Sequence, residues 1–214
     1  MRKILIAVTF AAIAYAGCKK KDNTISMVVT ASYPTVKITG PQYVSILVGG
    51  SFTPPSATAY DSFYRQSCSV VKNLGTLNNN VPGLYTVVYS AKNQYGFVGS
   101  TNVYVAVTNI TDSLDISGRY LRGTNPAYIT KIARGLFRTS NVGGDDTATQ
   151  ASSVIPAVFA VTSDTTLDFG SQLTSAGTLT ASSEVLSLAP GDTTLSYAIS
   201  LTGFGPQVRS FTKQ

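Results

Sequence analysis

The sequence predicts an all-β protein in two parts, an N-terminal β-sandwich and a C-terminal antiparallel β meander that forms either a second sandwich or an open barrel. After Tyr33, apolar and polar residues alternate in short runs, which is the period of half-buried strands. Turn signals rich in Gly, Pro and Asn separate these runs. Helical periodicity does not occur beyond the N-terminal apolar run. Strands of this length with turns between them are typical of sandwiches and barrels.

The composition excludes several kinds of active site and does not indicate a nucleic-acid partner. The 214 residues include no His, so a Ser-His-Asp triad, a Cys-His pair and a His-ligated zinc are excluded. There is also no Trp, the usual stacking platform for sugars and bases. The net charge of +6 owes much to Arg2, Lys3 and the run Lys19–Lys21. Because these residues do not cluster on a fold, the charge does not predict nucleic-acid binding.

Residues 1–17 are predicted to be a cleaved signal peptide. A basic start, Met1 to Lys3, precedes the apolar run Ile4 to Ala16, which as a helix of about 20 Å is too short to span a bilayer. The run ends in Ala14-Tyr15-Ala16-Gly17-Cys18, which resembles a bacterial lipoprotein box. The resemblance implies cleavage before Cys18, a diacylglycerol on its thiol and an acylated amine. The alternative is an ordinary signal peptide with a Cys near its cleavage site.

Residues 18–31 are predicted to be the lipidated Cys18 followed by a flexible polar tether. A lipid anchor makes the membrane the first partner, with the bacterial outer membrane as the expected location. Whether the protein lies on the outer surface or the periplasmic face stays open, because the stretches that direct export are usually acidic and Lys19-Lys20-Lys21-Asp22 has one acid. With Cys18 lipidated, Cys68 has no disulfide partner, and we expect it to be a small buried hydrophobe.

The first β domain is predicted over residues 32–108. Its strands are expected at 35–39, 43–48, 84–91 and 97–107, with turns at Gly49-Gly50 and 93–96. Tyr85, Tyr89 and Tyr104 alternate along two of these strands and are expected mostly in the core.

Two segments carry a resemblance to bacterial Ig-like modules. Gly-Gly-Ser-Phe-Thr-Pro-Pro-Ser-Ala-Thr-Ala-Tyr-Asp, residues 49–61, is similar to one conserved block of these modules. Val-Pro-Gly-Leu-Tyr-Thr-Val-Val-Tyr-Ser-Ala-Lys-Asn, residues 81–93, is similar to another. The resemblance covers about Tyr33 to Val107 and implies an Ig-like sandwich that spaces, adheres or binds sugars. The family has no common ligand site, so no binding residue transfers.

The second β domain is predicted over residues 109–214. Strands are expected at 157–162, 166–169, 177–181 and 194–201, with a turn at 190–192. Residues 115–144, with Ile-Ser-Gly-Arg-Tyr-Leu-Arg, a Thr-Lys-Ile strand and a Gly-Leu-Phe strand, resemble the C-terminal half of Bacteroides-type surface lipoproteins that join it to an Ig-like module.

The strongest candidate for ligand binding is a loop-like stretch over residues 59–66. Tyr60, Phe63, Tyr64 and Arg65 place three aromatic rings within five residues beside a cation. Buried strand residues alternate with polar ones, whereas Phe63 and Tyr64 are adjacent, so at least one of them is expected to face solvent. An exposed ring can stack on a sugar, and Arg65 can bond its hydroxyls or a carboxylate.

A basic stretch begins the second domain. Arg119, Arg122, Lys131, Arg134 and Arg138 either form a patch for anions or acidic glycans, or are a solvent-facing row that protects a sheet edge.

The acidic residues do not predict chemistry. Asp145-Asp146 could bind a cation, but a solvated turn is favoured because calcium needs six or more oxygen ligands. Asp164, Asp168 and Glu184 could form a glycosidase set, yet Asp164 lies in a turn signature and nothing around it predicts a cleft. We therefore predict no catalytic residue, no metal and no cofactor.

The sequence favours a non-catalytic, membrane-anchored lipoprotein that binds glycans or mediates adhesion at the cell envelope. Its expected partners are glycans or outer-membrane sugar-import proteins, with no nucleic acid. The alternative is a structural or assembly lipoprotein that spaces or braces other envelope proteins.

Overall fold

The computed structural model describes residues 29–189, 191–201, 204–205 and 207–214. The predicted signal peptide, Cys18 and most of the tether lie outside these residues. The chain divides into two compact units, residues 1–31 and 32–214, and the fold below is that of the second unit. Within the described residues no helix has the length and apolarity needed to cross a bilayer.

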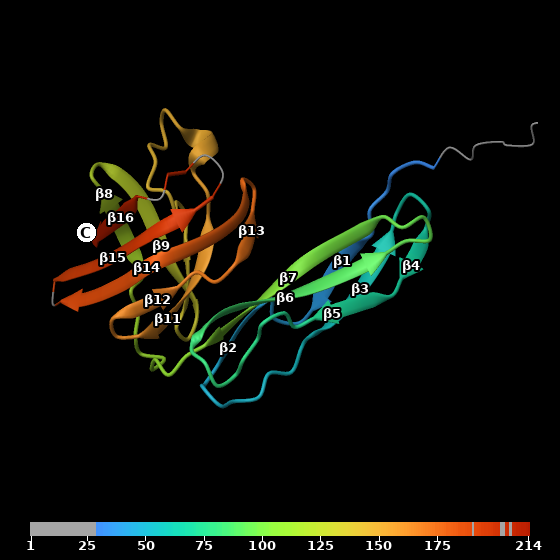
Figure 1. The fold of residues 1–214 in the computed structure, drawn as a ribbon, viewed down its shortest axis with the longest axis horizontal. Helices are drawn as coiled ribbons and strands as arrows, with labels where there is room; N and C mark the ends of the chain where they lie inside the picture. The colour runs from blue at the N-terminus through green and yellow to red at the C-terminus, as the bar shows by residue number, and fades with distance from the viewer. Residues whose placement is uncertain (1–28, 190, 202–203, 206) are drawn as a thin grey trace, which may run out of the picture. The chain divides into compact units, whose positions relative to one another are not determined.

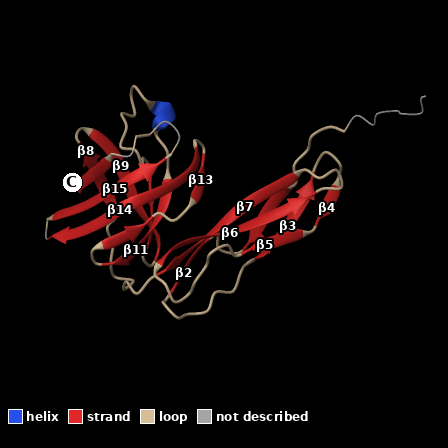
Figure 2. Cartoon of the chain, viewed as in Figure 1, coloured by secondary structure: helices blue, strands red, loops and turns tan. Residues whose placement is uncertain are grey.

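The second unit is built from β-strands, which confirms the predicted fold class (Figure 1). In the described ranges, helical structure is confined to the short 3-10 turn η1 (Ala151–Ser153) (Figure 2). The alternation read from the sequence thus corresponds to strands along the chain.

The N-terminal part is a sandwich of two sheets. One sheet has the order β1-β3-β4 and the other β2-β7-β6-β5, with β2 parallel to β7 and every other pair antiparallel. The strands are β1 (Thr35–Thr39), β2 (Tyr43–Ile46), β3 (Ser56–Asp61), β4 (Gln66–Cys68), β5 (Val70–Asn73), β6 (Gly83–Lys92) and β7 (Val98–Val107).

The sandwich core lies where the alternation predicted it. Val87, Tyr89, Val103 and Val105 are fully buried between the two sheets. Tyr104 is also buried, but it lies in a different cluster from its strand neighbours, whereas Tyr85 is only half-buried. Strand β7 is therefore covered on both faces.

The predicted loop over residues 59–66 is shorter in the structure. Ala59 to Asp61 end β3 and Gln66 begins β4, so the loop is reduced to residues 62–65. The prediction missed β4 because this strand has three residues, too few to show a period.

The C-terminal part is one curled antiparallel sheet. Its order is β12-β11-β10-β9-β8-β16-β15-β14-β13, so the first and last strands, β8 and β16, pair in the middle. A backbone hydrogen bond of 2.9 Å from Leu186 N–H to Thr165 C=O brings β14 toward the far edge strand. This arrangement matches the open-barrel alternative. The strands are β8 (Gly118–Arg122), β9 (Asn125–Ala133), β10 (Leu136–Thr139), β11 (Ala157–Ser163), β12 (Thr166–Asp168), β13 (Gln172–Thr174), β14 (Gly177–Ala189), β15 (Asp192–Ser200) and β16 (Val208–Lys213).

The interior of the curled sheet is filled by side chains. A row of rings crosses it with centroid separations between 4.6 and 5.8 Å, formed by Phe137, Phe159, Phe169, Tyr197 and Phe211. All five rings are buried. The buried rings fill the interior of the sheet, so its outer face and its loops are the candidate binding surfaces.

Contacts join the sandwich to the curled sheet inside the second unit. Asp168 Oδ2 accepts a hydrogen bond of 2.8 Å from Leu84 N–H, and Thr108 Oγ1 donates one of 2.7 Å to Val161 C=O. An apolar cluster that includes Leu84, Tyr104 and Val158 is buried beside them. Because the Thr108 bond is buried, it anchors the connection between the two parts.

Candidate binding surfaces

A buried carboxylate organises one end of the sandwich. Asp61 Oδ1 accepts hydrogen bonds from the backbone N–H groups of Phe63 and Tyr64, each at 3.1 Å, and so fixes the β3–β4 hairpin. The same oxygen accepts one of 2.7 Å from Ser32 Oγ. Its Oδ2 accepts one of 2.8 Å from Asn93 Nδ2. The carboxylate thereby ties the start of the unit to two hairpins.

Asn93 completes this network, which we call the Asp61–Asn93 clamp. Its Nδ2 also donates to Ser32 C=O at 2.9 Å, and its Oδ1 accepts from the N–H groups of Tyr95 and Phe97 in the β6–β7 turn. Asp61 and Asn93 are the last residues of the two segments that resemble Ig-like modules. The spacing of those segments therefore brings their ends into one hydrogen-bonded pair.

The clamp also sets the charge of Asp61. Burial alone would raise its pKa. The hydrogen bonds from Asn93, Ser32 and the backbone of Tyr64 and Phe63 outweigh burial and hold the pKa below its ordinary value. The carboxylate is therefore ionised at neutral pH and fully engaged in holding the loops.

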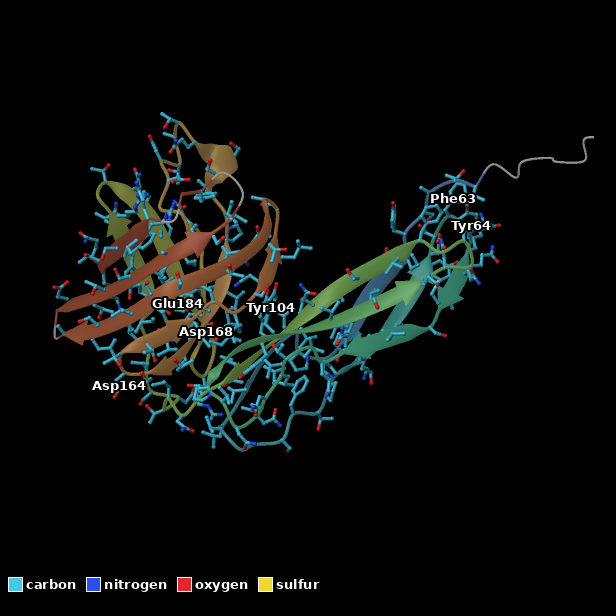
Figure 3. The ribbon with its side chains drawn as sticks, in the orientation of Figure 1. Phe63, Tyr64, Tyr104, Asp164, Asp168 and Glu184 are labelled. Carbon is cyan, nitrogen blue, oxygen red and sulfur yellow. The ribbon has the colours of Figure 1, made fainter. Side chains whose placement is uncertain are left out.

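Five aromatic rings gather at the end of the sandwich that the clamp organises. Phe63 and Tyr64 meet edge to face at 4.9 Å, and Tyr64 lies 4.5 Å from Tyr95. Tyr33 and Phe97 form a second pair at 5.5 Å. Figure 3 shows Phe63 and Tyr64 on the hairpin at the end of β3 and β4. We call these five residues the aromatic tip.

Two of the four predicted binding residues, Phe63 and Tyr64, belong to this tip. The side chain of Phe63 is 60% exposed, as the adjacency of Phe63 and Tyr64 predicts, and that of Tyr64 is half-buried between rings. Tyr60 lies on β3, exposed and outside the ring cluster, and Arg65 closes the hairpin in the left-handed region at φ 51°. Ligand binding by these four residues stays a prediction.

Sequence reasoning missed the other members of the tip. Tyr33, Tyr95 and Phe97 lie about thirty residues from the loop in the chain, and only the pairing of β1 with β3 and of β6 with β7 brings them near it. The Asn-Gln-Tyr-Gly turn was the available signal, because a Tyr inside a turn is not a core position.

The five cations of the second domain separate into two groups. Arg122 approaches Asp145 at 3.8 Å and donates to Gly143 C=O, and Lys131 pairs with Asp112 at 3.3 Å. The Nε of Arg134 is buried without a hydrogen-bond partner among the described residues, so a ligand cannot reach it. Arg119 and Arg138 are exposed, and their side chains make no hydrogen bond or ion pair with any described residue. Their guanidinium groups are therefore available to a ligand.

Tyr128 lies between these two unpaired arginines. Arg119 on β8 is directly opposite Tyr128 on β9, and Arg138 on β10 is opposite Thr130, one position further along the same face of β9. Direct partners have Cβ atoms about 5 Å apart and diagonal neighbours about 7 Å. Tyr128 is 55% exposed. We call Arg119, Tyr128 and Arg138 the sheet-face site.

A depression of about 380 Å³ adjoins Tyr128, lined also by Thr130, Arg138, Ser140 and Pro156. The sequence contained a signal for this position. In Ala-Tyr-Ile-Thr, alternate residues of the strand face opposite sides of the sheet. Ala127 and Ile129 are buried, so Tyr128 and Thr130 face outward.

Three other hollows lack the combination of an exposed ring and free cations, and one of them, of about 460 Å³, is lined by Asp164 and uncharged residues of the 109–114 segment. The largest, of about 650 Å³, lies along residues 74–80 and has no charged side chain and only Phe52 as a ring. The third, of about 440 Å³, lies between β6, β7 and β13 and is lined by hydroxyl, amide and apolar groups without a charge.

The acidic candidates are used by the fold. Asp145 pairs with Arg122, and Asp146 accepts from Ala148 N–H and Thr149 Oγ1 in its own turn, as the solvated-turn prediction expects. Asp164 is exposed in the turn between β11 and β12. In the part of the chain that the structure describes, no group of three or more Cys, Asp or Glu could hold a metal ion.

Asp168 and Glu184 support the edge of the curled sheet (Figure 3). Asp168 accepts from Leu84 and Gly170 N–H, and Glu184 Oε1 accepts from Phe169 N–H at 2.7 Å. Burial raises the pKa of Glu184 to about 7, the hydrogen bond from Phe169 opposes this shift, and Asp168 adds to it. Neither residue lines a described hollow.

Cys68 differs from its predicted state. It is half-buried on the edge strand β4, not fully buried, and its Sγ lies 3.8 Å from Gln66 C=O. The short edge strand leaves one side of the thiol uncovered, which residue type alone does not reveal.

Comparison with known proteins supports the N-terminal assignment. Residues 36–107, about a third of the chain, match the family model described as bacterial surface protein, Ig-like domain. This match confirms the resemblance to bacterial Ig-like modules and indicates a location at the bacterial cell envelope. Among solved structures, the chain is similar to the lipoprotein BT2262 from Bacteroides thetaiotaomicron, with 21% identity, coverage of 85% of this chain and 100% of that one, and a TM-score of 0.36. No curated protein sequence matches the chain.

Proposed function

We propose that the protein is a non-catalytic lipoprotein, anchored through Cys18 to the bacterial outer membrane, that binds acidic glycans through the sheet-face site. The observation that carries this proposal is the exposed ring of Tyr128 between two guanidinium groups that have no partner among the described residues. The Ig-like module then serves as the spacer that holds the curled sheet.

The chemistry of the sheet-face site fits a sugar that carries carboxylates. The flat face of Tyr128 can stack on the apolar face of a pyranose ring, which by analogy with aromatic pairs contributes about 1 kcal/mol. Arg119 and Arg138 can each bond a uronic carboxylate in a bidentate manner. Exposed ionic contacts contribute about 0.2–1 kcal/mol each, so one site is expected to bind with a Kd of about 1 mM or weaker. Many anchored copies acting on one polymer raise the effective affinity.

The depression beside Tyr128 adds specificity to this surface. Ser140 Oγ accepts a hydrogen bond of 2.9 Å from the backbone N–H of Tyr128, which holds the hydroxyl beside this residue. A polymer that lies across β8, β9 and β10 would meet a cation, the ring and a second cation in turn. Outer-membrane sugar-import proteins are natural partners for such a protein, because they would receive the glycan that it concentrates.

The experiment measures retention of the purified full-length protein, in detergent, on immobilised uronic-acid polymers and on neutral polymers. Tyr128→Ala should reduce retention on the acidic polymers by about fivefold, and Arg119→Gln and Arg138→Gln by up to about fivefold each, with unchanged melting temperature. Added salt should weaken binding of the native protein. Tyr60→Ala, which removes another exposed tyrosine, is the matched control.

Two results would contradict the proposal. If Phe63→Ala abolishes retention while Tyr128→Ala does not, the glycan site is the aromatic tip that the sequence suggested. If the native protein is retained on no glycan, the structural or assembly role becomes the better explanation.

A further inference from the structure

The aromatic tip exposes apolar surface at the hairpin ends. Tyr33 and Phe63 are 63% and 60% exposed, and Val98 beside them is 52% exposed. Phe63 has no hydroxyl, so its exposed side chain forms no hydrogen bond with water. The two most exposed rings of the described sandwich thus lie at this one end, which indicates a surface that is covered when the protein is in place.

The tip is also where the chain joins the folded unit. Ser32, the first residue of that unit, is held by the Asp61–Asn93 clamp through its hydroxyl and its carbonyl. Pro34 passes so close to β7 that a Cβ on Gly99 would lie 1.8 Å from its carbonyl oxygen. The chain that precedes Ser32 is therefore joined to the sandwich at the tip.

The length of the preceding chain limits how far the tip can be from a lipid anchor. Fourteen Cα–Cα steps separate Cys18 from Ser32. Fully extended, such a segment spans at most about 50 Å, and every other conformation is shorter. With Cys18 acylated, the anchor is joined to the sandwich at the tip, and the tip stays within this distance of the bilayer.

The charges around the tip suit a membrane surface. Residues 62–66 and 92–98 contain two exposed cations, Arg65 and Lys92, and no carboxylate, while the nearby Asp61 is buried. Tyr rings with wet hydroxyls are enriched at membrane interfaces, and cations there attract anionic headgroups. Rings and cations thus occur together as they do in interfacial anchors.

We propose that the aromatic tip rests in the headgroup region of the membrane that carries the lipid anchor. Phe63, Tyr33 and Tyr95 contact the interface, and Arg65 and Lys92 pair with lipid phosphates. This contact rests on the proposed lipidation of Cys18 but not on the sheet-face site. It gives the lipid anchor a second attachment, formed by protein side chains.

The absence of Trp from the sequence allows a direct test. Phe63→Trp introduces a single fluorescent reporter in the tip, and Val185→Trp places one on the exposed face of β14 as the matched control. Each full-length, lipidated variant is reconstituted into vesicles of phosphatidylethanolamine and phosphatidylglycerol, with or without brominated acyl chains. Flotation of the vesicles reports the anchor, and quenching by bromine reports contact with the bilayer.

The expected result is that both variants float with the vesicles, but only the Phe63→Trp emission shifts to the blue and is quenched several-fold more than that of the control. Tyr33→Trp should behave like Phe63→Trp and serves as the second reporter if the hairpin variant does not fold. Equal, weak quenching of all reporters in floating protein would overturn the proposal while leaving the anchor intact.

Two further outcomes separate this inference from the proposed function. If none of the variants floats, the anchor itself is wrong and the membrane contact fails with it. If soluble uronic-acid polymer shifts the Phe63→Trp emission and bromine does not quench it, the tip binds glycan and the membrane proposal is refuted.

Discussion

Truncation of Tyr89 tests the sandwich core most directly. The ring is fully buried between the sheets, and its hydroxyl donates a hydrogen bond of 2.9 Å to Pro55 C=O in the segment before β3. Tyr89→Ala removes the ring and leaves a cavity, a change that typically lowers the free energy of unfolding by about 3–5 kcal/mol. Tyr89→Phe removes only the hydroxyl and should cost about 1 kcal/mol, because a neutral hydrogen bond is lost.

These magnitudes can be separated by experiment. For a domain of this size, each kcal/mol shifts the melting temperature by about 2–4 °C, so Tyr89→Ala should melt about 6–20 °C earlier and Tyr89→Phe about 2–4 °C earlier. Urea unfolding of the same variants gives the free energies. Tyr60→Ala, on an exposed position of β3, should change stability by less than about 0.5 kcal/mol. If Tyr89→Ala is no worse than Tyr60→Ala, the inward face of β6 has been assigned wrongly.

Three further predictions follow from the anchor, the sheet edge and the start of β1. Cys18→Ser should abolish incorporation of labelled lipid and release the protein from the membrane fraction; unchanged retention would refute the lipoprotein interpretation. Because burial raises the folded-state pKa of Glu184 to about 7, from an ordinary value of 4.5, the free energy of unfolding should fall as the pH rises through that interval; solvent screening of this partly exposed group keeps the fall well below the roughly 3 kcal/mol of the full shift. Glu184→Gln should remove this contribution, and urea midpoints at pH 5 and pH 8 that differ as much as in the native protein would contradict it. Gly99→Ala should push Pro34 off β7 and lower the melting temperature, whereas Gly96→Ala, at a turn with open space around it but with a positive φ of 92°, should cost only its backbone strain of about 1 kcal/mol.

The fold was most predictable where one strand face is apolar and the other polar. The run from Leu84 to Ala91 shows this alternation and is a central strand of the sandwich. Strand β16 has the same burial pattern but was missed, because its inward positions hold Arg209 and Phe211. The Arg209 guanidinium is satisfied by the carbonyls of Gly143, Gly205 and Gln207. A buried cation held by distant carbonyls breaks the alternation that sequence reading depends on.

Strand β14 shows a second limit of that reading. The strand was expected to end at Ala181, but it continues to Ala189. Its pairing with β15 shifts between Ser182 and Val185, and Ser183 adopts a positive φ of 54°. This bulge changes which side chains face inward, so one period cannot describe both halves of the strand.

The candidate surfaces were predictable to different degrees. The adjacency of Phe63 and Tyr64 predicted an exposed ring, but a single sequence does not show that Tyr33 and Tyr95 lie beside it. For the basic stretch, the residue types were evident and their pairing was not. The positions of Asp145 and the Gly143 carbonyl near Arg122 distinguish that engaged cation from the free Arg119.

The Asp61–Asn93 clamp gives the protein a mechanical property. If the protein is anchored through Cys18 as proposed, a pull on the anchor reaches the sandwich at Ser32. Strand β7 runs from the tip to Val107, so the load passes lengthwise along the strands, across a ladder in which β1 and β3 pair from Thr35 to Thr39. Ladder hydrogen bonds lie perpendicular to the strands, so tension along the strands loads all of them together. The clamp holds Ser32, which precedes β1, so its hydrogen bonds are loaded before those of the ladder. Resistance to force depends on the unfolding rate, so a few hydrogen bonds at the pulled end can govern how long the sandwich survives under tension.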